Sequence, residues 1–287
     1  MKKPVWIARE TNAALAAACC PPRRQDTHKG DYGRILLLCG AEGYTGAPAL
    51  AAKAAVRSGA GLVFVGVPRS VYPVVAAKLD SPVVFPLPDK EGKLSVEALP
   101  EIVSRLAQMD ACLLGPGLGR GSEVEQVVRE VLQQCRCPLV LDADGINAIA
   151  SNPDSLRHVA CPIILTPHEG EFHRLTSSPE KDRISGAVTL AKQLHAVVLR
   201  KGHETIITDG NEIYVNHTGN AGMAVGGSGD VLAGIVTALL GQGNAPLTAA
   251  AAAAWLHGRA GDLAAAELGQ YAMAPGDLIE RLPQILP

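Results

Sequence analysis

Short apolar runs alternate with glycine-rich loops and helices over most of this chain, and that alternation limits the folds it can adopt. Residues 34–39 contain an unbroken apolar run typical of a buried strand. A glycine loop at 40–46, a helix of small residues at 47–58 and a second apolar run at 62–67 follow. Strand, crossover helix and strand form a βαβ unit, in which the two strands are parallel. The sequence therefore predicts a parallel sheet.

The alternation continues through the middle of the chain and changes character near residue 205. Further strands are predicted at 82–87, 111–114, 138–141, 163–165 and 197–199, and most are separated by helices. Residues 205–208 and 212–215 are then joined by Asp209-Gly210-Asn211, which is typical of a hairpin turn. We find no repeat or low-complexity linker, so residues 1–287 are predicted to form a single domain. The predicted fold is three-layered α/β/α, with a mostly parallel central sheet and an antiparallel hairpin at its edge.

Both ends of the chain are predicted to be helical. An alanine-rich segment, 7–18, predicts a short helix before the first strand. Three helices are predicted to finish the chain, near 229–240, 247–268 and 275–282. The alanine-rich segment 249–255 suits either a close contact between subunits or the core.

Charge and composition argue against several kinds of partner. The net charge is −2 and no long basic run is present, which argues against nucleic acids and anionic membrane surfaces. The first residues lack the apolar stretch of a signal peptide, and residues 247–256 are too few to span a bilayer. The seven cysteines lack the spacing of metal-binding pairs. We therefore expect a cytoplasmic protein with reduced thiols rather than disulfides or metal ligands.

Polar and glycine-rich clusters follow the predicted strands. In open parallel sheets, ligands bind outside the carboxyl ends of the strands. Clusters in these positions therefore predict one large binding site. They occupy residues 40–46, 115–121, 142–145, 166–171, 200–204 and 216–230.

The sequence Gly226-Gly227-Ser228-Gly229-Asp230 precedes an apolar run with helical spacing. Glycines let the backbone approach a ligand closely, and the free N–H groups at a helix start attract anions. Asp230 places a carboxylate beside that anion site. A carboxylate next to an anion hole suits the transfer of a phosphoryl group to or from an alcohol. The alternative is that Asp230 only stabilises the first turn of its helix.

The glycine loop at 115–121 follows a predicted strand and precedes a helix, as a dinucleotide-binding loop does. It departs from that motif because Arg120 stands where the third glycine should be. We interpret it as a loop that lets a bulky ligand lie close, with a plain turn as the alternative. Asp142 and Asp144 follow the next strand and suit contacts with a metal or substrate. Asp144 is also suited to capping the next helix.

His168 lies on the first turn of a predicted helix that Thr166 would cap. We favour a contact between His168 and a substrate, with a structural role as the alternative. A zinc site is not favoured, because the spacing to His173 does not suit a ligand pair. After the next strand, Lys201 or Arg200 could reach a phosphate as a point charge, and a solvated turn is the alternative.

In this order, the segments resemble the NAD(P)H-hydrate dehydratase family, which belongs to the ribokinase-like superfamily. The resemblance extends from about Pro21 to about Ile279. The segments that carry it are 28–33, 43–47, 115–119, 142–145, 166–171 and 218–230. The resemblance implies a ribokinase-like fold and a hydro-lyase that repairs hydrated nicotinamide cofactors.

The resemblance also implies a two-step reaction. The substrate is the S epimer of hydrated NADH or NADPH (NADHX or NADPHX), in which water has added across the 5,6 double bond of the nicotinamide. A nucleotide phosphorylates the added hydroxyl, and loss of phosphate restores NADH or NADPH. The bacterial branch uses ADP and releases AMP, and the eukaryotic branch uses ATP. Since no eukaryotic targeting segment is visible, we expect ADP, with nucleotide-bound Mg²⁺.

The family's residue roles carry over by motif. Asp230 would take the proton of the hydroxyl, and Gly227, Ser228 and Gly229 would form the anion hole. Contacts to the hydrated dinucleotide would come from Ala47, Gly117, Gly119, His168 and Asp230. Contacts to ADP and AMP would come from Lys201, Gly202, His203, Glu204, Thr205 and Gly229. Asp142 and Glu171 would help to hold magnesium and water.

The resemblance also implies partners for this protein, and two other functions compete with the one it implies. The family commonly forms homotetramers, and in many bacteria this domain is fused behind an epimerase that interconverts the R and S hydrates. Few residues precede Pro21, so we expect a separate epimerase. One rival is a ribokinase-like kinase of a small hydroxylated molecule, which would share Asp230 but stop at a phosphorylated product. A second rival is a nucleotide sensor, which would gain nothing from a carboxylate at Asp230.

Overall fold

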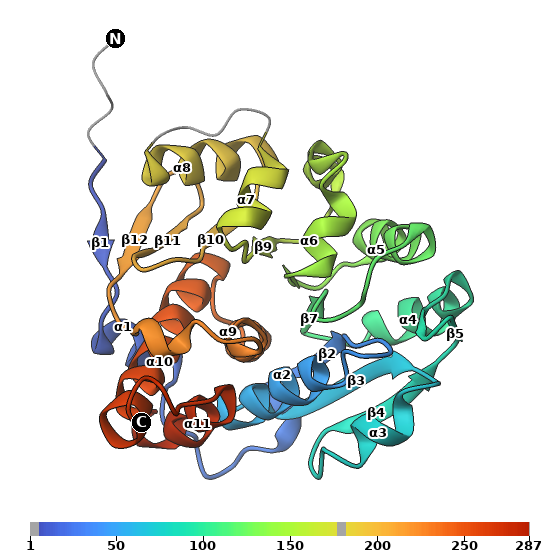
Figure 1. The fold of residues 1–287 in the computed structure, drawn as a ribbon, viewed down its shortest axis with the longest axis horizontal. Helices are drawn as coiled ribbons and strands as arrows, with labels where there is room; N and C mark the ends of the chain where they lie inside the picture. The colour runs from blue at the N-terminus through green and yellow to red at the C-terminus, as the bar shows by residue number, and fades with distance from the viewer. Residues whose placement is uncertain (1–5, 177–181, 287) are drawn as a thin grey trace.

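A computed structural model describes residues 6–176 and 182–286 of the protein. Its main strands are β1 (Arg9–Glu10), β2 (Arg34–Leu38), β3 (Leu62–Pro68), β4 (Val83–Leu87), β7 (Ala111–Leu114), β8 (Leu139–Leu141), β9 (Ile163–Leu165), β10 (Val197–Arg200), β11 (Thr205–Thr208) and β12 (Ile213–Asn216). They form one ten-stranded sheet in the order β1-β12-β11-β10-β9-β8-β7-β2-β3-β4 (Figure 1). A second, two-stranded sheet pairs β5 (Asp89–Lys90) with β6 (Lys93–Leu94) in antiparallel fashion.

The large sheet is mostly parallel, as the sequence predicts. Neighbouring strands from β10 to β4 all pair in parallel. The predicted hairpin is β11–β12, and β11 also pairs antiparallel with β10. Its turn is closed by the carboxylate of Asp209, which accepts from the N–H groups of Asn211 and Glu212 at 2.8 Å each. Within the described sheet, β11 is therefore the strand that runs against the others.

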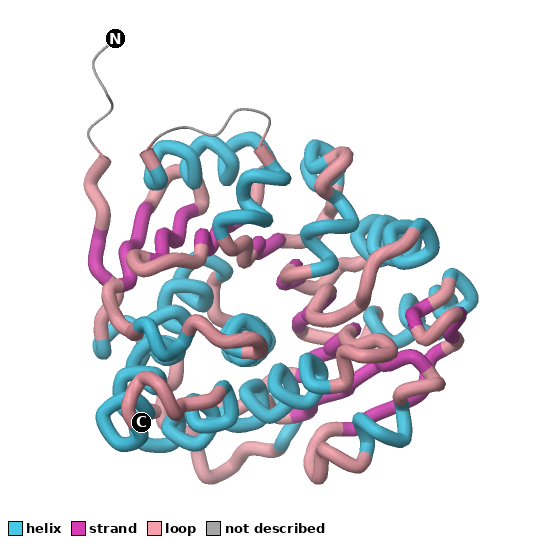
Figure 2. The backbone as a smooth tube through the Cα atoms, in the orientation of Figure 1, coloured by secondary structure: helices cyan, strands magenta, loops and turns pink. Residues whose placement is uncertain are grey.

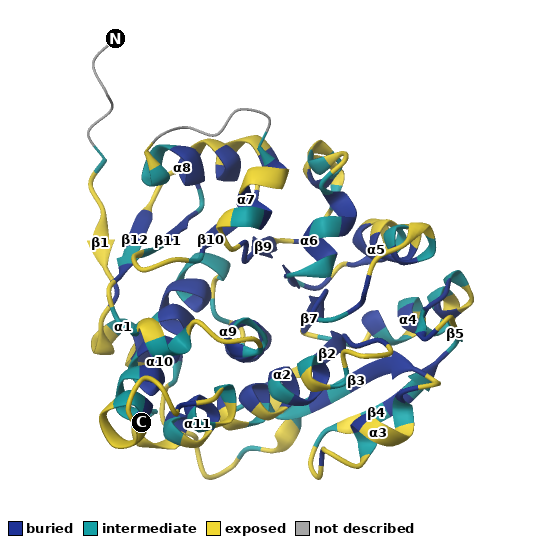
Figure 3. Cartoon of the chain, in the orientation of Figure 1, coloured by how far each residue is buried: buried dark blue, intermediate teal, exposed yellow. Residues whose placement is uncertain are grey.

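Helices cover both faces of the sheet, as the tube in Figure 2 shows. One face carries α1 (Ala13–Cys19), α2 (Gly46–Arg57), α3 (Tyr72–Ala76), α9 (Ser228–Gly241), α10 (Pro246–Leu268) and α11 (Pro275–Arg281). The other carries α4 (Leu99–Leu106), α5 (Ser122–Gln134), α6 (Asp144–Ile149), α7 (Glu169–Leu175) and α8 (Arg183–Leu194). Alternate residues of a strand face opposite sides, so Ile35 and Leu37 belong to one core, and Leu36 and Leu38 to the other. Most helices are buried toward the sheet and exposed outward, whereas α9 is buried on nearly all sides (Figure 3).

Small residues let the helices of the first face approach each other closely. A β-carbon on Gly234 of α9 would lie 2.2 Å from the carbonyl oxygen of Ala51 in α2, so only glycine fits at this crossing. In α10, the alanines from Ala249 to Ala254 are at most 3% exposed. Of the two readings for this alanine-rich segment, burial in the chain's own core is the one observed.

The N-terminal segment differs from the helix predicted over 7–18. Residues Arg9–Glu10 form β1, which pairs in parallel with β12 and lies outside the hairpin, at the edge of the sheet. The Thr11 hydroxyl donates to Asn216 Oδ1 at 2.7 Å, which ties the chain to the sheet. Helix α1 then begins after Asn12, whose side chain accepts from the N–H of Leu15 at 2.9 Å. The cap and the open sheet edge together shorten the predicted helix.

Two further sequence expectations concern the cysteines and the membrane. Six of the seven cysteines are buried, and burial raises the pKa of the Cys39 and Cys112 thiols well above the usual range. Within residues 6–176 and 182–286, no helix combines the length and apolar character needed to cross a bilayer.

Candidate active site at the carboxyl ends of the strands

A cavity of about 880 Å³ lies at the carboxyl ends of β8, β9, β10 and β12. Four of the six predicted clusters contribute to its lining: 142–145, 166–171, 200–204 and 216–230. Chain connectivity brings them together, because neighbouring parallel strands end at the same rim of the sheet. The cavity has the size and mixed lining of a small-molecule site.

The glycine loop before α9 forms a candidate anion site in this cavity. Gly227 has a φ of 100°, and a β-carbon there would lie 2.6 Å from Leu50 Cδ1. This left-handed conformation turns the chain directly into α9, which begins at Ser228. The N–H of Ser228 donates to the carbonyl of Val225 at 3.3 Å. The N–H groups of Gly229 and Asp230, next in the first turn, have no acceptor within the helix and suit an anion.

Asp230 lines the cavity on the same first turn. Burial raises the pKa of its carboxyl to about 7, and the negative charge of Asp142 adds to the rise while Lys201 opposes it. A carboxyl group with a pKa near neutrality can both accept and return a proton at physiological pH. The geometry therefore pairs an anion site with a group able to act as a base.

Lys201 is held by carboxylates beside the anion site. Its Nζ lies 2.9 Å from Asp142 Oδ1 and 3.9 Å from Glu171 Oε2. It also lies 3.4 Å from where a β-carbon on Gly229 would be. Burial alone would lower the pKa of Lys201, but the neighbouring carboxylates raise it above its ordinary value. The ammonium therefore stays charged next to the loop that would hold an anion.

Asp142 is the residue that fixes this ammonium. It is buried, and the Thr166 hydroxyl donates to the same Oδ1 atom at 2.6 Å. The sequence predicted that Thr166 would cap α7, and this prediction is wrong. The helix begins two residues later than that interpretation requires, at Glu169, with His168 as its N-cap.

His168 lines the cavity and also has a structural task. Its Nδ1 accepts from the N–H groups of Gly170 at 3.0 Å and Glu171 at 3.3 Å. In return, Glu171 Oε2 accepts from the His168 N–H at 2.9 Å, which completes a capping box. Because Nδ1 is an acceptor, the neutral ring carries its proton on Nε2. Both interpretations of His168 therefore stay open: it caps α7, and it lines the cavity.

The predicted nucleotide-binding segment lies partly in the cavity. Lys201, Gly202, His203 and Thr205 line it, whereas the side chain of Glu204 lies 3.6 Å from His217 Nδ1, outside the lining. Arg200, the alternative to Lys201, does not face the cavity. Its guanidinium is buried over the Phe172 ring, 3.7 Å from the centroid, and pairs with Glu169.

Ala47, Gly117 and Gly119 form a second group, separate from the lining of this cavity. A β-carbon on Gly117 would lie 3.1 Å from Cβ of Ala47, so the 115–121 loop touches the first turn of α2 here. The N–H of Gly119 donates to Asp144 Oδ2 at 2.9 Å. Asp144 is the first residue of α6, not its cap, and it joins the 115–121 loop to the rim beside Asp142.

Asp142 and Glu171 do not form a metal site by themselves. In the described parts of the chain, no three metal-binding side chains come close enough to hold an ion. Asp142 Oδ1 already accepts from both Thr166 and Lys201. Magnesium commonly binds through one or two carboxylates together with substrate phosphates, so these residues suit a metal that arrives with a nucleotide.

The sequence analysis did not single out the part of this site that α10 supplies. His257 on α10 lines the cavity and contacts Ser228 from behind the glycine loop. The one signal in the sequence is a histidine that interrupts an apolar, alanine-rich helix.

Comparisons with known proteins identify the family. The sequence profile described as NAD(P)H-hydrate dehydratase matches residues 35–284. The bifunctional NAD(P)H-hydrate repair enzyme Nnr of Moorella thermoacetica is 45% identical over 283 residues, which are 95% of this chain and 53% of that protein. The ADP-dependent (S)-NAD(P)H-hydrate dehydratase of Listeria monocytogenes is 34% identical over 94% of this chain and 93% of its own length.

A solved structure supports the same assignment. The ADP/ATP-dependent NAD(P)H-hydrate dehydratase of Bacillus subtilis, co-crystallised with ATP and Mg²⁺, superposes with a TM-score of 0.80 at 30% identity and 96% coverage of each chain. The chain spans about half the length of the bifunctional relatives it matches. With the family profile covering most of its length, this chain belongs to the NAD(P)H-hydrate dehydratase family.

Proposed function

We propose that this protein is an ADP-dependent hydro-lyase that converts the S epimer of NADHX or NADPHX to NADH or NADPH, with release of AMP and phosphate. One observation carries the proposal: the carboxyl of Asp230, with a pKa raised to about 7, stands on the first turn of the helix that forms the anion site. A base with a pKa near the working pH accepts a proton most effectively.

The first step is a phosphoryl transfer to the substrate. Asp230 takes the proton of the added hydroxyl. At the same time, the oxygen of that hydroxyl forms a bond to the terminal phosphorus of ADP. The bond from that phosphorus to the bridging oxygen breaks, and AMP leaves with the electron pair. The N–H groups of Gly229 and Asp230 and the Lys201 ammonium stabilise the negative charge of the transferring group.

The second step is an elimination. The bond between C6 of the nicotinamide and the phosphate oxygen breaks, and phosphate leaves with the electron pair. The lone pair of the ring nitrogen stabilises the positive charge, and loss of a proton from C5 restores the 5,6 double bond. Phosphate is a much better leaving group than hydroxide, so ADP divides one difficult elimination into two easier steps. No oxidant or reductant is consumed.

Magnesium would neutralise the nucleotide phosphates when bound. We propose that it enters with the nucleotide, and that Asp142 and Glu171 mainly hold Lys201 in place. The distances of 2.9 Å and 3.9 Å from Lys201 Nζ support this division. The nucleotide would lie against Lys201, Gly202, His203, Thr205 and Gly229. The hydrated dinucleotide would extend past Asp230 and His168 toward Ala47, Gly117 and Gly119.

The cellular setting is also a proposal. We propose a cytoplasmic homotetramer that works together with a separate epimerase, since the S hydrate is the epimer that this site would consume. The resemblance of the chain to its family supports this setting, and size measurements in solution test the tetramer.

One assay tests the reaction. The protein is incubated with chemically hydrated NADH, ADP and Mg²⁺, and the absorbance of the dihydronicotinamide is followed, with a parallel reaction containing ATP. We expect the absorbance to return with ADP, together with one AMP for each NADH. No recovery with either nucleotide would refute the proposal.

The same assay separates the rival kinase. A kinase of a different small hydroxylated molecule would restore no absorbance from hydrated NADH and would consume the nucleotide only when its own alcohol is supplied. A nucleotide sensor would consume no nucleotide with either molecule. The kinase would use the same anion site and Asp230, so recovery of the dihydronicotinamide decides between the two enzymes.

A further inference from the structure

His257 contacts the anion site from a helix that none of the predicted clusters includes. Its ring lies on α10 and is 9% exposed. Its Nε2 lies 2.9 Å from the carbonyl oxygen of Ser228 and 3.2 Å from the hydroxyl of the same residue. Both contacts reach the first residue of α9, where the proposed phosphoryl group would bind.

The two contacts define the protonation of the ring. A carbonyl oxygen only accepts hydrogen bonds, so Nε2 carries the hydrogen at this distance. Burial lowers the pKa of His257 to about 4, and the hydrogen bond to the Ser228 carbonyl only partly opposes this effect. The ring is therefore neutral at physiological pH and keeps its single proton on Nε2.

This proton sets the direction of the Ser228 hydroxyl. Because Nε2–H points at Ser228, the hydroxyl oxygen turns a lone pair toward the ring. Its own hydrogen then points away from His257. Ser228 lines the cavity together with Gly229 and Asp230, so the free hydrogen is available to an anion there.

Neighbouring residues of α10 hold the loop that precedes the glycine loop. A β-carbon on Gly258 would lie 2.1 Å from Thr218 Oγ1, so helix and loop are in direct contact. One turn later, Asp262 accepts from the N–H of Gly219 and from the side chain of Asn220, at 3.2 Å each. One face of α10 therefore fixes both loops on this side of the cavity.

We propose that His257 is a positioning residue that holds Ser228 so that its hydroxyl donates a hydrogen bond to the phosphoryl group during transfer. This inference rests on the proposed function, because it assigns the Ser228 hydroxyl to the same phosphoryl-transfer step. His257 itself touches neither substrate nor nucleotide in this role.

The test uses three variants of the full chain. His257→Leu keeps the volume of the ring but removes the donor, and His257→Gln keeps an N–H donor. Thr237→Val is the matched control, because Thr237 is fully buried in α9 and donates to the carbonyl of Ala233 at 2.7 Å, away from the cavity. We expect His257→Leu to lower kcat about 10- to 100-fold, the loss expected when a charged transition state loses one hydrogen-bond donor. The KM for hydrated NADH should change less than about twofold, since the lost contact acts in the transition state.

The Gln and Val variants separate positioning from stability. His257→Gln should recover most of the lost kcat, and Thr237→Val should leave kcat unchanged even if it lowers Tm. Equal kcat losses in all three variants would overturn the proposal, because a general loss of stability would then explain them.

A double variant tests the path through the hydroxyl. In a Ser228→Ala background, His257→Leu should cause little further loss of kcat, because no hydroxyl remains to be oriented. Losses that multiply fully would overturn the inference while leaving the proposed reaction intact. If the wild type does not dehydrate the hydrate at all, the proposed function fails instead. The affinity for inorganic phosphate, measured by calorimetry, then decides the inference: His257→Leu must weaken it and Thr237→Val must not.

Discussion

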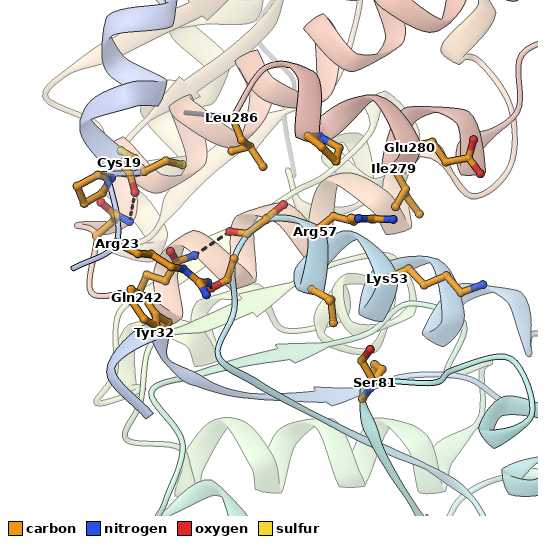
Figure 4. Close-up of a pocket in the computed structure, with 18 of the residues that line it drawn as sticks. Cys19, Arg23, Tyr32, Lys53, Arg57, Ser81, Gln242, Ile279, Glu280 and Leu286 are labelled. Carbon is orange, nitrogen blue, oxygen red and sulfur yellow. Dashed lines mark hydrogen bonds between the residues drawn. The ribbon is translucent and has the colours of Figure 1, made fainter. Parts of the chain in front are cut away.

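Two cavities at opposite rims of the sheet differ in the burial of their charges. The cavity at the carboxyl ends of the strands measures about 880 Å³ and holds the buried carboxylates of Asp142 and Glu171 around Lys201. The other, drawn in Figure 4, measures about 1130 Å³ and lies near the amino ends of β2, β3 and β4. Its charged side chains are all exposed: Arg23, Asp31, Lys53, Arg57, Asp80 and Glu280.

The comparison shows that volume alone does not mark an active site. Exposed charges are surrounded by water, which weakens their effect on a ligand, whereas buried charges act through a medium of low polarity. In the second cavity, Arg23 is occupied with its neighbours: it donates to the carbonyl of Gly59 at 2.6 Å and lies 3.9 Å from the Tyr32 ring centroid. We therefore propose that the smaller cavity carries the chemistry.

The largest expected effect of a single change is at Asp230. Asp230→Asn removes the proposed base, and we expect kcat to fall by roughly 10²–10⁴-fold while the affinity for ADP is kept. Steady-state kinetics and calorimetry measure the two quantities. In the other cavity, Asp80→Asn should leave kcat unchanged. An unchanged kcat in Asp230→Asn would show that the base lies elsewhere.

A glycine from each cavity gives the next effect. Gly227→Ala forces a side chain onto a φ of 100° and against Leu50, which displaces the first turn of α9. We expect a loss of about 10²–10³-fold in kcat, as when an oxyanion donor is removed. Gly276 lines the other cavity and has open space around it, so Gly276→Ala is the control. Equal activity of the two variants would contradict the role of the loop.

A lysine from each cavity, Lys201 and Lys53, gives the third comparison. Lys201→Met removes the buried ammonium and leaves Asp142 and Glu171 without their cation. The KM for ADP should rise roughly tenfold or more, because the nucleotide phosphates lose an attracting charge and face two carboxylates instead. Lys53→Met, in the exposed cavity, should change this KM less than about twofold. The prediction fails if the two lysine variants have the same KM for ADP.

The smallest effect is a dependence on pH. Because Asp230 must be ionised to act as a base, kcat/KM should fall about tenfold per unit as the pH drops below its pKa of about 7. The raised pKa also means that the folded protein binds this proton more tightly than the unfolded chain. The stability contributed by Asp230 is therefore complete below its unfolded pKa and is lost as pH rises through about 7. Asp230→Asn should accordingly raise Tm at pH 8, and a lower Tm there would contradict the sign.

The sequence predicts most of the fold because its strands and loops have local signals. Each of these signals is a short stretch of neighbouring residues. Examples are the apolar run that forms β2, the glycine loop before α9 and the turn residues at Asp209. The choice between Lys201 and Arg200 has no such signal. Arg200 ends β10 and Lys201 follows it, and their positions depend on the pairing of Arg200 with Glu169 and Phe172, far away in sequence.

The parts that could not be predicted depend on contacts between distant segments. The edge strand β1 forms because β12 leaves an open edge, about 200 residues later in the chain. The contact of His257 with Ser228 crosses between two helices whose own sequences only predict burial. Local patterns cannot specify such contacts, since they appear only when the core packs.

Thr166 and Lys201 both donate hydrogen bonds to Asp142, and this arrangement affects how the fold tolerates insertions in its loops. Each residue is the first after its strand, β8, β9 or β10, and these strands are neighbours. The positive charge of the site is therefore anchored to the frame of the sheet and not to the loops that continue from it. Insertions farther along those loops can reshape the walls around a ligand without displacing the ammonium, so one charged centre can serve proteins with differently shaped pockets.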